Sequence, residues 1–140
     1  MGFSLGTIVA SYTIRTLHSL VQKNEEQFAH CKTMIHDLYL LAGAHSFDLV
    51  DEKENEMAWA YYLQGVNGRL VNCWSTRDGT LKHLFTSAVK NRKAIGTGDI
   101  IPWVSSNLEI KRCENYDCSK EASGHLAYSY PVILSKIDAI

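Results

Sequence analysis

A chain of 140 residues is long enough for one domain with its own hydrophobic core, so we predict a single domain over residues 1–140. Its 46% hydrophobic and 21% charged residues exclude a disordered or fibrous protein. A net charge of −1 provides no overall basic field, which argues against nucleic acid as a partner. The early apolar stretch from Leu5 to Ile14, about ten residues, is too short to cross a bilayer, so we predict no membrane segment.

Residues 1–45 are predicted to be helical. There is no proline, and apolar residues follow a heptad spacing of 3 and 4 at Phe28, Cys31, Ile35, Leu38 and Ala42, with Gly43 as the helix cap. Two alternatives stay open: one continuous helix, or two collinear helices that break in the polar stretch 23–27. The heptad seam predicts a homodimer formed through the helix that runs from Leu17 to Ala42.

A β-hairpin is predicted around Asn67-Gly68. This pair lies between aromatic and β-branched runs at 58–66 and 69–74, and it favours a type I′ turn because both central positions of that turn need a positive φ. With these two residues as the loop, Tyr61 pairs with Trp74. Neither face of the strand pair is polar, so we expect both faces to be covered.

One helix and three more strands complete the predicted fold. The helix covers about 80–92, with Asp78 or Thr80 as its cap. Strands are predicted at 94–104, 108–113 and 126–132. The fold class is therefore α+β, with a long N-terminal helix packed on a five-stranded antiparallel sheet within 57–140, in the order α-β-β-α-β-β-β.

Several local features accompany this order. They are a long helix ending near Gly43, an apolar segment with a glycine turn at 62–71, Arg77-Asp78-Gly79 before a helix, and a last strand at 128–132. With these features the chain resembles the PAS-like sensory modules and, among them, the single-Cache domains of bacterial receptors. Roadblock-type and profilin-like interaction modules share the same element order.

The resemblance implies a non-catalytic sensory domain that binds a small organic ligand without a cofactor, dimerises through its long helix and transmits a signal. The compartment stays open between the cytoplasm and an extracytoplasmic part of a bacterial receptor. The first alternative is a protein–protein interaction or inhibitor module that uses an apolar sheet face or the helix seam. The second is a small enzyme with a pocket on a curved sheet.

The implied ligand pocket lies between the sheet and the helix that follows its second strand. Aromatic side chains with polar tips need partners when they are buried, and a ligand supplies them, although the same side chains also form ordinary cores. An arginine there meets an acidic ligand group. The predicted ligand-binding residues are Trp59, Tyr61, Trp74, Arg77, His83, Trp103, Tyr128 and Tyr130.

Cys113 and Cys118 flank a predicted loop tip, where they form a disulfide in an oxidising compartment or stay as free thiols. No metal site is predicted, because His30 and His36 do not share a helix face and the spacing of the cysteines with His125 matches no standard zinc pattern. No catalytic residue is assigned from sequence motifs.

Overall fold

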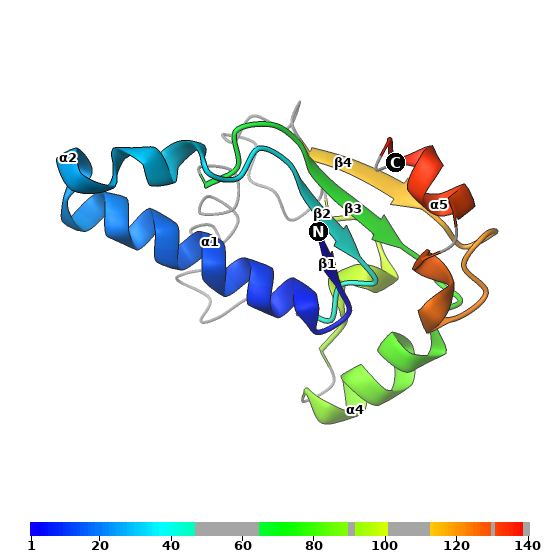
Figure 1. The fold of residues 1–140 in the computed structure, drawn as a ribbon. Helices are drawn as coiled ribbons and strands as arrows, with labels where there is room; N and C mark the ends of the chain where they lie inside the picture. The colour runs from blue at the N-terminus through cyan, green and yellow to red at the C-terminus, as the bar shows by residue number, and fades with distance from the viewer. Residues whose placement is uncertain (47–64, 90–91, 101–112, 130, 139–140) are drawn as a thin grey trace.

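A parallel β-sheet forms the centre of the protein in the computed structural model, which describes residues 1–46, 65–89, 92–100, 113–129 and 131–138. The strands lie in the order β1-β2-β3-β4, and each neighbouring pair is parallel, so the four strands run side by side in one direction (Figure 1). Their bounds are Gly2–Phe3 for β1, Leu38–Leu41 for β2, Leu70–Trp74 for β3 and Cys113–Asp117 for β4. The predicted five-stranded antiparallel sheet of PAS/profilin type is therefore wrong.

Helical segments lie in the connections from β1 to β2 and from β3 to β4, as is usual between parallel strands. Between β1 and β2 lie α1 (Gly6–Lys23), α2 (Glu25–Phe28) and the 3₁₀ turn η1 (Ala29–Thr33). Between β3 and β4 lie the π-helical η2 (Thr80–Phe85), α4 (Thr86–Ala88) and the 3₁₀ turn η3 (Ile95–Thr97). After β4 come the 3₁₀ turn η6 (His125–Ser129) and α5 (Pro131–Lys136). None of these helices is long and apolar enough to cross a bilayer, a statement limited to the described ranges.

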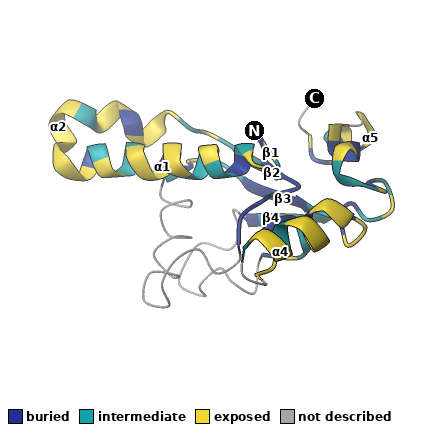
Figure 2. Cartoon of the chain, turned by 90° about the horizontal axis from the view of Figure 1, so that it is seen from below, coloured by how far each residue is buried: buried dark blue, intermediate teal, exposed yellow. Residues whose placement is uncertain are grey.

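The core covers both faces of the sheet, and Figure 2 shows most of β2 and β3 in the colour of buried residues. One cluster joins the sheet to α1 through Ile14, Leu38, Leu40, Val66, Leu70, Ile95, Ile100 and Cys113. The opposite face packs against η2, η6 and α5 through Leu41, Val71, Cys73, Leu81, Tyr128, Ile133 and Ile137. For β3, the expectation that both faces are covered is confirmed.

The N-terminal half is not the predicted long helix. It breaks after Lys23, where Asn24 turns to an extended conformation and its side chain accepts a hydrogen bond from the Gln27 amide to cap α2. This is the polar stretch at which the two-helix alternative placed a break. Leu38–Leu41 then forms β2 rather than helix, so the heptad seam on which the homodimer prediction rested does not exist. The homodimer itself stays a prediction.

The predicted hairpin is also wrong. Neither Asn67 nor Gly68 has a positive φ, and their amides donate to the carbonyl oxygens of Ile35 (3.0 Å) and His36 (2.6 Å), just before β2. Both edges of β3 are occupied by parallel partners, β2 and β4, which leaves no edge for an antiparallel strand from 58–66. Residues 58–64 of that strand lie outside the described ranges.

Of the other predicted elements, one helix is present and shorter than predicted, and two strands are wrong where they are described. A helical segment does begin at Thr80, capped by the Asp78 carboxylate, which accepts from the Leu81 amide (3.0 Å), but it ends at Ala88. The predicted strand at 94–104 begins instead with a 3₁₀ turn, and the predicted strand at 126–132 consists of η6 and the start of α5 where it is described. Residues 101–112 lie outside the described part of the chain, and with them the end of the predicted strand at 94–104 and most of the one at 108–113.

The loop after β2 folds back onto α1. Ser11 on α1 donates its hydroxyl hydrogen to the Thr7 carbonyl (2.7 Å), so Nε2 of His45 carries the hydrogen of its own 2.7 Å contact with the Ser11 oxygen. His45 is only 8% exposed, and this burial lowers its pKa to about 4. His45 is therefore neutral in the folded protein.

We predict that His45 makes the protein less stable as the pH falls from about 6.5 to 4. In this window the unfolded chain takes up a proton on His45 and the folded chain does not, so the free energy of unfolding decreases towards acid. Relative to His45→Gln, the wild type should lose up to about 3 kcal/mol between pH 7 and pH 4. Urea unfolding of both proteins at each pH measures this difference; a difference independent of pH would contradict the burial of a neutral histidine.

Candidate active site

A sharp turn at Ser4 connects β1 to α1. Ser4 has a φ of 52°, in the left-handed region that costs a residue other than glycine about 1–3 kcal/mol. Its backbone is held on both sides: the amide donates to the Leu41 carbonyl (3.0 Å), and the carbonyl accepts from the amides of Thr7 (3.1 Å) and Ala44 (3.3 Å) and from the Thr7 hydroxyl (2.6 Å). The turn is thus strained locally and fixed by its surroundings.

The glycine before this turn is required by close packing. A Cβ on Gly2 would lie 2.9 Å from the Thr7 Cα and 3.0 Å from the Gly6 carbonyl oxygen, closer than a side chain is accommodated against backbone. β1 and the first turn of α1 approach each other here because the chain reverses direction within Ser4 and Leu5. A side chain at position 2 would push the turn open.

The Ser4 hydroxyl is the first member of a chain of three polar side chains. Nε2 of His125 lies 2.8 Å from the Ser4 Oγ, and Nδ1 of the same ring lies 2.7 Å from Oδ2 of Asp78. The three residues are 47 and 121 positions apart in these two contacts. Only the tertiary structure brings them together.

The sheet topology explains why these three side chains lie close together. Ser4 follows β1, Asp78 follows β3, and His125 follows β4, so all three come from chain segments after the carboxyl ends of parallel strands. These ends meet at one edge of a parallel sheet, which is where α/β proteins place their sites.

The hydrogen-bond partners of His125 define which of its ring nitrogens carries a hydrogen. The Asp78 side chain is fully buried and that of His125 is 14% exposed. Since a carboxylate only accepts hydrogen bonds, Nδ1 of His125 carries the hydrogen, and Nε2 of the neutral ring accepts the hydroxyl hydrogen of Ser4. The second oxygen of Asp78 accepts the Leu81 amide, which fixes the carboxylate at the start of η2.

Aromatic packing supports the histidine. The ring of Phe3 lies 5.2 Å from that of His125, centroid to centroid, and 6.4 Å from the ring of Tyr128. Tyr128 is fully buried, and burial raises its pKa, so it is a neutral part of the wall behind the site.

The backbone amide of Leu5 is a candidate hydrogen-bond donor to a negatively charged oxygen. It stands at the N-terminus of the 18-residue helix α1, where the first amides have no acceptor within the helix and the helix dipole is positive. Among the described residues, none accepts a hydrogen bond from it. The residue after a serine nucleophile supplies such a donor to an oxyanion in related geometries.

These parts together suit nucleophilic acyl chemistry. A histidine that accepts the hydroxyl hydrogen activates a serine, and a buried carboxylate on its other nitrogen holds the ring in the required tautomer. A nearby free amide at a helix N-terminus stabilises an oxyanion.

Four of the predicted ligand-binding residues, Trp74, Arg77, His83 and Tyr128, lie in the described part of the chain. Trp74 ends β3 and is half-buried, whereas Arg77 and His83 are exposed. Tyr128 is fully buried, and its ring lies near that of Phe3, which in turn lies near the ring of His125. Trp59, Tyr61, Trp103 and Tyr130 lie outside the described ranges.

Cys113 and Cys118 do not flank a loop tip. Cys113 begins the extended strand β4 and Cys118 directly follows its end, and both thiols are free. Five residues of strand span about 16 Å, more than a disulfide bridges. Burial raises the pKa of Cys113 to about 12, so this thiol is protonated and inert.

The sequence contained a signal for the site that we did not assign. Gly2-Phe3-Ser4-Leu5-Gly6 is a Gly-x-Ser-x-Gly motif between a short apolar strand and a helix, the pattern of a nucleophile elbow. The prediction that placed Leu5 in one long helix, with no strand before it, removed the strand–turn–helix context that gives the motif its meaning. Asp78 was recognised only as a helix cap, and His125 only as a rejected zinc ligand.

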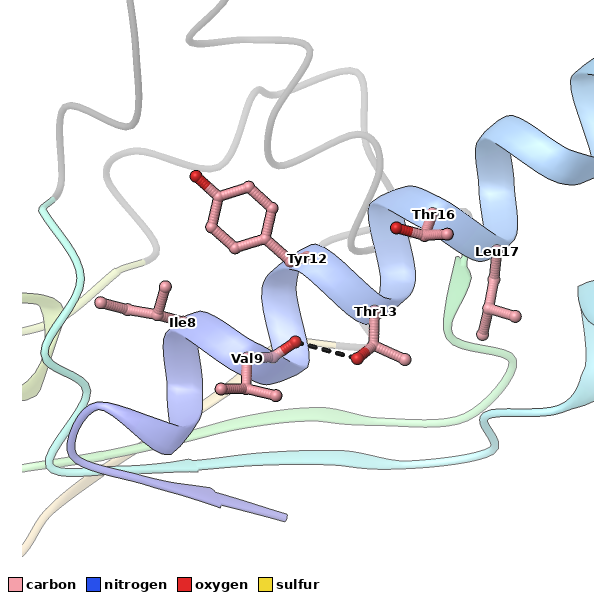
Figure 3. Close-up of a pocket in the computed structure, with 6 residues that line it drawn as sticks. All are labelled: Ile8, Val9, Tyr12, Thr13, Thr16 and Leu17. Carbon is pink, nitrogen blue, oxygen red and sulfur yellow. Dashed lines mark hydrogen bonds between the residues drawn. The ribbon is translucent and has the colours of Figure 1, made fainter.

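An apolar groove runs along α1 beyond the turn. It has a volume of about 420 Å³ and is lined by Ile8, Val9, Tyr12, Thr13, Thr16 and Leu17 (Figure 3). The groove begins about one helical turn after Ser4. Leu5, Val9 and Tyr12 are each more than 60% exposed, so the outer face of α1 next to the candidate nucleophile is apolar.

A comparison with protein families adds a match over almost the whole chain. A family model described as "Protein of unknown function (DUF726)" matches residues 1–139. The chain belongs to this family. No curated protein and no solved structure matches it. Since the description of DUF726 assigns no activity, the function has to be argued from the site.

We predict that Asp78→Asn lowers the reactivity of the Ser4 hydroxyl by about 10⁴-fold. If the amide oxygen of the new side chain keeps the hydrogen bond from Leu81, its NH₂ group faces Nδ1 of His125 and forces the hydrogen onto Nε2, which then cannot accept from Ser4. The rate of reaction with a fluorophosphonate measures the loss. The matched control is Asp117→Asn, which removes an exposed carboxylate bonded to Ser119; equal rates for the two variants would contradict the role of Asp78.

Proposed function

We propose that the protein is a serine hydrolase that cleaves an acyl bond, such as an ester, through an acyl-enzyme intermediate on Ser4. The observation that carries the proposal is the hydrogen-bonded series from Ser4 through His125 to Asp78, with distances of 2.8 and 2.7 Å. The chain order Ser, Asp, His and the position of the serine on a strand-to-helix turn are those of α/β-hydrolases. The parallel sheet agrees with that comparison.

In the proposed reaction, His125 takes the hydroxyl proton as Ser4 Oγ attacks the substrate carbonyl carbon. The resulting oxyanion accepts a hydrogen bond from the Leu5 amide. When the intermediate collapses, the bond to the leaving group breaks, and His125 donates its proton to that group. A water molecule then attacks the acyl-enzyme with His125 again as base, which releases the carboxylic acid and restores the Ser4 hydroxyl.

Asp78 supports both halves of the cycle. When His125 takes a proton it becomes a cation, and the buried carboxylate beside Nδ1 stabilises that charge without moving. Because Asp78 also accepts the Leu81 amide, the carboxylate is oriented before any substrate binds. This pre-arrangement is what distinguishes an active site from a surface histidine–carboxylate pair.

A purely structural role for the same side chains does not explain the strain at Ser4. A serine at positive φ costs stability, and glycine would occupy this conformation without that cost. Strained backbone of this kind is typical of functional positions, where the geometry of one side chain is held by the fold. Here the strain presents the Ser4 hydroxyl to His125.

Exposed apolar residues beside the site favour a substrate with an apolar acyl group. Leu5 follows the nucleophile and is 66% exposed, and Leu126 follows the histidine and is 76% exposed. The small-ligand sensory domain implied by the sequence resemblance stays a prediction, but the antiparallel fold on which it depended is not the fold of this chain.

We predict that the wild-type protein is labelled covalently by a fluorophosphonate, which loses fluoride to the Ser4 oxygen, and that Ser4→Ala is not labelled. The removed group is the nucleophile itself, whereas Ser19→Ala removes an exposed serine of α1 and should leave labelling unchanged. Mass spectrometry of the intact proteins gives the result. Labelling of Ser4→Ala, or no labelling of the wild type, would reject the proposed function.

We also predict a preference for longer acyl chains. Each buried methylene contributes about 0.8 kcal/mol, so kcat/KM for p-nitrophenyl butyrate should exceed that for the acetate by about tenfold. Replacing the apolar neighbour in Leu126→Ser should reduce this ratio while both esters remain substrates. Equal kcat/KM values for the two esters in the wild type would contradict an apolar acyl site.

A further inference from the structure

The loop that follows β2, residues 42–46, is built against the nucleophile turn. Ala42 has a φ of 47°, a second strained non-glycine position, and this conformation turns the chain so that the Ala44 amide reaches the Ser4 carbonyl at 3.3 Å. The segments that contain the two strained residues, Ser4 and Ala42, are thus joined by this hydrogen bond. Since that bond is long, further contacts are needed to hold the loop in place.

One side of the loop is fixed by backbone contacts to η3. The Gly96 amide donates to the Gly43 carbonyl (3.0 Å), and the Ile95 amide donates to the His45 carbonyl (2.7 Å). A Cβ on Gly96 would lie 2.4 Å from the Gly43 nitrogen, so the two segments are in direct backbone contact. These bonds set the loop against the sheet but do not tie it to α1.

On its other side, the loop is tied to α1 by the side chain of His45. His45 directly follows Ala44 in the chain, and its Nε2 meets the Ser11 oxygen at 2.7 Å. Ser11 in turn donates to the carbonyl of Thr7, the residue whose amide and hydroxyl both bind the Ser4 carbonyl. A continuous series of hydrogen bonds therefore runs from His45 through Ser11 and Thr7 to the backbone of Ser4.

We propose that His45, acting through Ser11, is a positioning residue that holds the Ser4 turn in its reactive geometry under His125. This inference rests on the proposed hydrolase function. His45 does not touch the reacting atoms; it fixes the distance between the loop and α1, and with it the backbone to which the nucleophile belongs. Displacement of a catalytic group by about 1 Å lowers rates by about 10²-fold, so a contact of this kind affects turnover directly.

The variants His45→Leu and Ser11→Ala break the series, and His45→Gln keeps it, because the Gln amide donates from nearly the same place as Nε2. Matched controls are His36→Leu, which replaces an exposed histidine before β2, and Ser19→Ala on the outer side of α1. The measurements are amide hydrogen exchange at Ala44 by NMR, and kcat and KM with p-nitrophenyl butyrate.

We expect His45→Leu and Ser11→Ala to exchange the Ala44 amide about tenfold faster and to lower kcat by about 10- to 100-fold with KM little changed. His45→Gln and both controls should match the wild type. Unchanged exchange at Ala44 in His45→Leu would overturn the inference whatever the activity, and so would a kcat equal to that of His36→Leu. A wild type without turnover is a separate result: it rejects the hydrolase function, and the positioning role falls with it.

Discussion

The left-handed backbone of Ser4 is the constraint on which the candidate site depends. A serine does not adopt this conformation by preference, so the fold must hold it, and it does so from two elements: the Leu41 carbonyl at the end of β2 binds the Ser4 amide, and Thr7 of α1 with Ala44 of the following loop bind the Ser4 carbonyl. The short strand β1 and the first turn of the long helix α1 can pack this closely only because Gly2 has no side chain. The strain has one evident result, which is that the hydroxyl stands within hydrogen-bonding distance of His125.

Gly96 connects the three segments that carry the site. Its amide binds the Gly43 carbonyl next to the nucleophile turn, and its carbonyl accepts from the Ser75 amide (3.0 Å), three residues before Asp78, and from the Tyr128 hydroxyl (3.4 Å), three residues after His125. Gly96, which takes no part in the proposed reaction, thereby fixes the segments that carry Ser4, Asp78 and His125 relative to one another. Pre-arrangement of this kind allows a polar site to act without reorganising during the reaction.

Part of the structure followed from local sequence signals. The strand Leu70–Trp74, the break after Lys23 and the cap at Asp78 are each defined by residues a few positions apart, and each is present. The failures share a cause. Leu38–Leu41 fits a helical seam as well as a buried strand, because a short continuous apolar run does not distinguish the two. The Asn67-Gly68 pair suggested a hairpin, but the partners of β3 are the parallel strands β2 and β4. Whether two strands run parallel depends on the crossover connection between them, and the pattern of apolar residues along one strand carries no information about that connection.

By itself, the sequence determined that the strand at 70–74 is covered on both faces, and it carried the Gly2-to-Gly6 motif of a nucleophile turn at its start. The motif indicates a nucleophile only if a strand precedes the serine, a helix follows it, and a histidine and a carboxylate from distant parts of the chain lie beside it. Those were decided only by the tertiary structure, because parallel pairing places the carboxyl ends of β1, β3 and β4 at one edge of the sheet. Proximity in space is a property of that pairing, and no spacing along the chain records that Ser4, Asp78 and His125 meet.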